Sequence, residues 1–135
     1  MAGDQRLVIA PLGGRLVVMR YVYVDPSSSE KPMEFVSPAG RTIVQRVEEV
    51  GDAKVAVTRR KGGYSARVDI PWKSIGEAVP FRGGARRADA GVIFGDATGT
   101  RVVRRQYLFD DGGQEVSDIP SEVRINPAAW GTFDF

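Results

Sequence analysis

The side chains of this sequence best suited to chemistry are aromatic rings and guanidinium groups on or beside predicted strands. Trp72 and Trp130 stand at strand boundaries, and Arg105 and Tyr107 lie two residues apart, so an extended backbone directs both to one face. Aromatic rings stack on the apolar face of a pyranose, and guanidinium groups bond its hydroxyls. These four are the candidate carbohydrate-binding residues. The alternative is an exposed basic strand with both tryptophans packed in the core.

Catalysis has little support in the sequence. The chain has no His and no Cys, which removes the commonest general base and nucleophile pairs. The stretch Gly95-Asp96-Ala97-Thr98-Gly99-Thr100 is similar to the phosphorylation motif of P-type ATPases, but Ala97 replaces the lysine of that motif. A hairpin turn explains these residues better, because Asp, Thr and Gly favour turns. We expect no enzyme activity.

Composition predicts one soluble folded domain spanning residues 1–135, with 42% hydrophobic and 27% charged residues. The 16 Gly and 8 Pro favour many turns. A net charge of +2 is too balanced to indicate a polyanionic partner by itself. Arginines gather between 82 and 105 near Phe81, Phe94 and Tyr107, but no recognition motif accompanies them, so nucleic acid is the less favoured partner. The acidic stretch from Asp110 onward is interpreted as solvated.

Period-two alternation and Gly-rich turns predict short antiparallel strands. Their ranges are 5–12, 15–24, 41–50, 53–59, 64–70, 90–95, 100–109 and 130–135. One helical turn is expected over 71–76 and another over 121–124, whereas 30–40 and 77–89 are expected to be irregular. The predicted fold is an all-β antiparallel β-sandwich, of jelly-roll or immunoglobulin-like type. No apolar run approaches membrane-spanning length, so no membrane partner is expected.

Three segments resemble carbohydrate-binding module family 9 and its DOMON-like relatives. The segment from Gly63 to Trp72 resembles the family's GGYxxExxIPW stretch, and Val116 to Thr132 resembles its closing stretch. Gly3 to Ile9 resembles a strand from the middle of the family's domain. The resemblance therefore implies the C-terminal two-thirds of such a domain, without its opening strands. Arg67 stands where the family has Glu, and Leu108 stands where it often has Trp.

The resemblance implies a non-catalytic carbohydrate-binding accessory module that acts with a larger secreted enzyme or surface protein. Its ligand would be a polysaccharide or an oligosaccharide. The resemblance implies an extracellular or periplasmic location, although the N-terminus lacks the features of a signal peptide. The alternative is a structural or protein-interaction β-sandwich that has lost ligand binding. A glycan array distinguishes these two classes.

No cofactor is expected. Some relatives bind haem, but the chain has no His, and Met19 and Met33 are a poor axial pair. Calcium accompanies some family members, and loop aspartates could supply oxygen ligands, although no spacing specifies a calcium loop. These aspartates are Asp89, Asp96, Asp110, Asp111 and Asp118.

An incomplete domain has a consequence for the first predicted strand. If the family's opening strands are missing, strand 5–12 should lie at an open sheet edge, where unpaired N–H and C=O groups invite another chain. Gln5 and Arg6 protect this edge weakly, because Leu7, Val8 and Ile9 follow directly. We therefore expect self-association, or dependence on upstream sequence.

Overall fold

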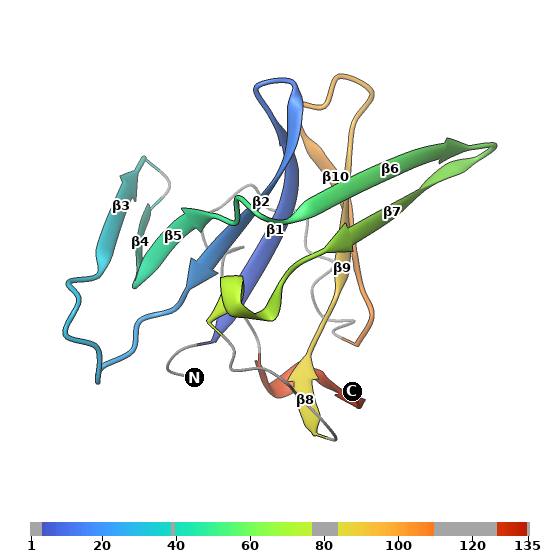
Figure 1. The fold of residues 1–135 in the computed structure, drawn as a ribbon. Coiled ribbons are helices and arrows are strands. Elements are labelled where there is room, and N and C mark those ends of the chain that lie inside the picture. The colour runs from blue at the N-terminus through green and yellow to red at the C-terminus, as the bar shows by residue number, and fades with distance from the viewer. Residues whose placement is uncertain (1–3, 39, 77–83, 110–126, 135) are drawn as a thin grey trace. The chain divides into compact units, whose positions relative to one another are not determined.

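The computed structural model describes residues 4–38, 40–76, 84–109 and 127–134, and these residues form an all-β structure of antiparallel strands (Figure 1). The strands are β1 (Gln5–Leu12), β2 (Arg15–Val22), β3 (Met33–Ser37), β4 (Gly40–Val44), β5 (Arg46–Glu49), β6 (Lys54–Arg60), β7 (Gly63–Asp69), β8 (Ala85–Ala88), β9 (Gly91–Gly95), β10 (Val102–Tyr107) and β11 (Gly131–Asp134). Two short 3-10 turns, η1 (Trp72–Ile75) and η4 (Pro127–Ala129), complete the described elements. Within these residues, no helix has the length and apolar character that crossing a membrane requires.

The chain divides into two compact units. Unit 1 comprises Met1–Glu34 and Ile43–Pro80, and unit 2 comprises Phe35–Thr42 and Phe81–Phe135. The antiparallel all-β prediction is confirmed, whereas the sandwich arrangement and the single domain stay predictions.

Unit 1 is built on a three-stranded sheet in the order β1-β2-β5. The hairpin β1–β2 turns at Gly13 and Gly14, whose φ angles are 58° and 81°. Two consecutive residues at positive φ match the twist of paired strands, which explains the glycine pair. Among the described strands β1 pairs only with β2, so it lies at the sheet edge, as expected.

Strand β2 is the centre of this sheet, and both of its faces are covered. Val17 and Val18 are adjacent in the sequence, and both are buried. Because successive strand residues face opposite sides, each valine fills a different face. Val44 and Val50 complete the buried apolar set among the described residues, and the Val50 N–H donates to the Val18 carbonyl over 2.8 Å.

The hairpin β6–β7 pairs from Lys54 opposite Asp69 to Arg60 opposite Gly63. Pro71 then precedes η1, and Gly76 ends it in the left-handed region with φ 76°. The predicted helical turn after the strand is therefore confirmed, in the tighter 3-10 form. Ser74 Oγ donates to Asp52 Oδ2 over 2.6 Å, which ties η1 to the turn before β6.

Two predictions for the segment between β2 and β6 were wrong. Residues 30–40 are not wholly irregular, because β3 forms there and pairs with β4. Stretch 41–50 is not one strand, because it bends at Gln45 between β4 and β5. The bend is the point at which the chain changes partner, from β3 to the central strand β2.

Unit 2 contains the pairs β8–β11 and β9–β10. β8 falls inside the stretch 77–89, which was predicted to be irregular, so that prediction was wrong over Ala85–Ala88. The reason is that β8 is stabilised by pairing with β11, a strand distant in the sequence. The turn between β9 and β10 is the predicted Asp-Thr-Gly hairpin turn. The predicted turn over 121–124 lies outside the described residues.

Candidate functional site

The candidate site is a hollow of about 440 Å³ in unit 1, which we call the polar hollow. Eight of its nine lining residues are polar or charged. The lining residues are Arg20, Val22, Asp25, Ser27, Ser28, Ser29, Glu30, Gln45 and Arg46. They come from β2, from the loop that follows it, and from the bend at the start of β5.

The loop wall of the hollow is shaped by Asp25. Asp25 Oδ1 accepts hydrogen bonds from the Ser27 N–H at 2.9 Å and from Ser27 Oγ at 2.6 Å. The Ser28 N–H donates to the Asp25 carbonyl, and Ser28 Oγ accepts from the Glu30 N–H at 3.1 Å. Asp and Ser side chains bond the backbone two residues on, which fixes such turns. The Ser27 hydrogen bonds hold the pKa of the Asp25 carboxyl below its usual range.

The floor of the hollow is held by Gln45, which is 7% exposed. Its Nε2 donates to the Glu30 carbonyl at 2.7 Å, and its Oε1 accepts from the Asp25 N–H at 3.4 Å. Its own N–H donates to the Val22 carbonyl at 2.8 Å. One buried carboxamide therefore joins both ends of the loop 25–30, which we call the serine loop, to the sheet.

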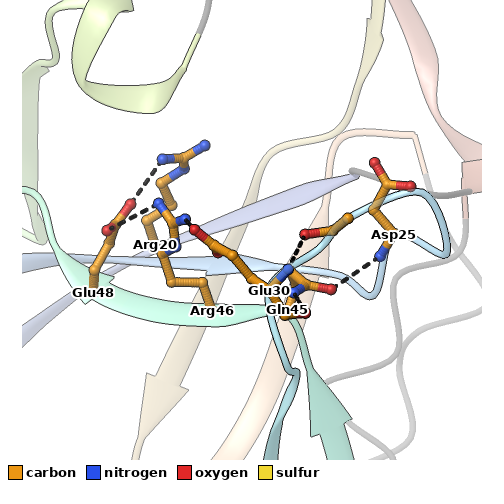
Figure 2. Close-up of polar contacts among 7 residues, drawn as sticks. Arg20, Asp25, Glu30, Gln45, Arg46 and Glu48 are labelled. Carbon is orange, nitrogen blue, oxygen red and sulfur yellow. Dashed lines mark hydrogen bonds and ion pairs between the residues drawn. The ribbon is translucent and has the colours of Figure 1, made fainter.

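A row of alternating charges borders Gln45 (Figure 2). Both Glu30 carboxylate oxygens accept from Arg46 Nη2, and Arg46 Nη1 lies 3.8 Å from Glu48 Oε2. Arg20 Nη1 donates to Glu48 Oε1 at 2.7 Å, and Arg20 Nε donates to Gln5 Oε1 at 2.8 Å. The hydrogen bond and charge of Glu30 raise the pKa of Arg46. These contacts fix the direction of every charged group in the row.

The polar hollow offers hydrogen-bond donors and acceptors in fixed positions. Carboxylates accept only, and guanidinium groups donate only, whereas serine hydroxyls do both. A ligand rich in hydroxyls meets both requirements. The sequence alone does not reveal this site, because Gln45 and Arg46 reach the loop after β2 only through the pairing of β5 with β2.

The predicted residues Arg105 and Tyr107 share one face of β10. Arg105 lies opposite Ile93 and is 7% exposed, whereas Tyr107 lies opposite Gly91 and is half-buried. The register shifts between Val102 and Arg104, which sets the faces of the strand after the shift. The guanidinium of Arg105 is therefore covered, while part of the Tyr107 ring remains accessible.

The predicted tryptophans belong to different units. Trp72 opens η1 in unit 1, and Trp130 immediately precedes β11 in unit 2. Both are half-buried. Arg87 Nη2 donates to the carbonyls of Ala128 and Trp130, each at 3.1 Å, which holds the backbone at Trp130. The structure thus groups Arg105 and Tyr107 on one strand face, with Trp72 in the other unit.

The opposite face of β9–β10 presents an exposed strip of Phe94, Arg104 and Gln106. Phe94 lies opposite Arg104, whose guanidinium carbon is 5.9 Å from the ring centroid. Arg104 Nη2 donates to Gln106 Oε1 at 3.3 Å. The signal that reveals this strip is the cross-strand register, which local sequence patterns do not determine.

The calcium candidates within the described residues accept hydrogen bonds from the backbone. Asp96 Oδ1 accepts from the N–H groups of Thr98 and Thr100, and from Thr98 Oγ1. Asp89 Oδ1 accepts from the N–H groups of Leu108 and Phe109. Among the residues that the structure describes, no group of three or more His, Cys, Asp or Glu is arranged to hold a metal ion. Asp110, Asp111 and Asp118 lie outside the described residues.

Comparison with known proteins assigns no family to this chain. No family model matches it, and neither a curated protein nor a solved structure matches it.

Proposed function

We propose that this protein is a non-catalytic carbohydrate-binding accessory module with a β-sandwich fold. The observation that carries the proposal is the polar hollow, in which guanidinium, carboxylate, carboxamide and hydroxyl groups are fixed around about 440 Å³. Sugar hydroxyls donate and accept at once, so they pair with both kinds of protein group. Binding sites with a few well-placed polar groups gain specificity in this way.

Preorganisation supports the proposal. Gln45 bonds both ends of the serine loop, and Glu30 holds the Arg46 guanidinium, so little side-chain freedom is left to lose on binding. Arg46 is nevertheless 44% exposed, which leaves its remaining N–H groups accessible to a ligand. The hollow is therefore ordered before the ligand arrives.

Aromatic stacking, the other common contact with sugars, is offered separately in unit 2. Phe94 is 39% exposed, and Tyr107 is half-buried. The Phe94 ring could stack on a pyranose while Arg104 or Gln106 bonds its hydroxyls, and Tyr107 offers a second ring on the opposite face of β9–β10. An accessory module of this kind would keep an attached enzyme or surface protein close to a polysaccharide.

The alternative is a structural or protein-interaction module without a ligand. The observation that favours it is the number of large apolar side chains left exposed, of which Val36 is the most accessible. Contiguous exposed apolar surface marks interaction sites. This alternative predicts that well-folded protein gives no binding signal on a glycan array.

The deciding experiment is a glycan array read with matched variants. Arg46→Ala should lose the glycan signal, whereas Arg15→Ala should keep it, because Arg15 forms the same kind of exposed pair, with Glu49, outside the hollow. Phe94→Ala and Tyr107→Ala test the two rings. If these two variants lose the glycan signal while Arg46→Ala keeps it, the binding site lies in unit 2. If the wild-type protein gives no glycan signal, carbohydrate binding is refuted.

A further inference from the structure

The hairpin β6–β7 carries a large excess of positive charge. From Lys54 to Asp69 the sequence has five basic residues and one acidic residue, a net charge of +4, against +2 for the whole chain. The remainder of the chain therefore carries a net charge of −2. The basic residues are Lys54, Arg59, Arg60, Lys61 and Arg67. Charge segregated onto one element produces a local positive potential that the overall balance hides.

Three of these cations gather at the closed end of the hairpin. Arg60 lies opposite Gly63, which leaves Lys61 and Gly62 as a two-residue turn, with Gly62 at φ 80°. Figure 1 shows the two green strands side by side up to this turn. We call Arg59, Arg60 and Lys61 the basic tip.

The basic tip has no counter-charge among the residues that the structure describes. All three side chains are exposed, and none makes an ion pair with any residue in the described part of the chain. Arg67, on the same hairpin, is by contrast paired with Asp69 at 3.0 Å. Adjacent like charges repel one another, and an anionic ligand would relieve that repulsion.

An aromatic ring lies beside these cations. Tyr64 is directly opposite Arg59 in the register, so the two side chains share one face of the hairpin. Tyr64 is 54% exposed, and Val57 on the same face is 45% exposed. The tip therefore combines a stacking surface with cations, which suits a sugar ring bearing a negative group.

We infer that the basic tip binds anionic polysaccharide, through the carboxylate or sulfate groups of successive sugars. The inference rests on the proposed carbohydrate-binding function and specifies the class of ligand. Single-stranded nucleic acid fits the tip less well, because such sites track the backbone along a groove and stack successive bases on several rings. The tip provides three cations and one ring, which matches a short charged glycan segment.

The test compares dextran with dextran sulfate, which share a glucan backbone and differ in charge. Wild type should bind dextran sulfate and lose affinity as salt rises, because exposed ion pairs are screened. R59Q/R60Q/K61Q should lose about tenfold in affinity. The control K31Q/K54Q/K73Q removes the same charge from other exposed positions of unit 1 and should bind as wild type does. Tyr64→Ala should weaken binding to polygalacturonate.

Three results would overturn the inference: equal loss of affinity in both triple variants, no preference for dextran sulfate over dextran, or tighter binding of oligothymidylate than of dextran sulfate. Binding of neutral glycans that depends on Arg46, without any gain from sulfate, would overturn this inference and leave the proposed function standing. Binding of dextran sulfate through the tip, with Arg46→Ala unaffected throughout, would support the inference and remove the role proposed for the polar hollow.

Discussion

The ring of Tyr107 occupies the space that a side chain at Gly91 would need. A Cβ placed on Gly91 would lie 2.5 Å from Tyr107 Cδ1 and 2.7 Å from Cε1. The two residues are directly opposite in the β9–β10 register. The absence of a side chain at Gly91 therefore sets the position of a candidate sugar-binding ring.

Gly91→Ala should destabilise the protein by about 1–3 kcal/mol, because overpacking displaces the ring or the strand. Urea unfolding measures the change in the free energy of unfolding. Gly63→Ala is the matched control, since Gly63 also lies in a strand and a Cβ there meets nothing within 4 Å. Equal midpoints for Gly91→Ala and wild type would show that Tyr107 moves freely.

Gln45→Met should cost about 1–3 kcal/mol, because the Glu30 carbonyl and the Asp25 N–H lose their partner. Gln106→Met changes an exposed glutamine and should stay within about 0.5 kcal/mol of wild type. Thermal unfolding of the two variants measures the difference. Equal effects would mean that Gln45 does not hold the serine loop.

The carboxyl of Asp96 should titrate below its ordinary pKa, chiefly because Thr98 Oγ1 donates to it. Its stabilising contribution is then complete above the unfolded pKa of about 3.9 and is lost as pH falls through the lower folded value. Thr98→Val should raise the pKa of Asp96. Ser27→Ala should do the same for Asp25 alone, and carbon-13 NMR titration of both carboxyls separates the two effects.

The edge strand β1 should promote self-association that rises with protein concentration in light scattering. Ile9→Lys, which places a charge on an exposed residue of this strand, should reduce it. Val24→Lys makes the same change outside the strands and should leave association unchanged. A wild-type chain that remains monomeric throughout the series would contradict this prediction.

Local patterns in the sequence determined most of the strands. Alternation from Tyr64 to Val68, the Gly13-Gly14 turn and the Asp96 turn act over a few residues, so propensity and turn chemistry sufficed to place β7, the β1–β2 hairpin and the β9–β10 hairpin. The 3-10 turn after Pro71 was predicted for the same reason.

Tertiary structure decided what depended on long-range pairing. β8 exists because β11 pairs with it, and the stretch around Gln45 bends because β4 and β5 have different partners. Arg105 is buried and Arg104 is exposed because side-chain direction in a strand reverses at every residue, so the two neighbours meet different surroundings. The polar hollow also depends on long-range pairing, since Arg46 meets Glu30 only when β5 is paired with β2.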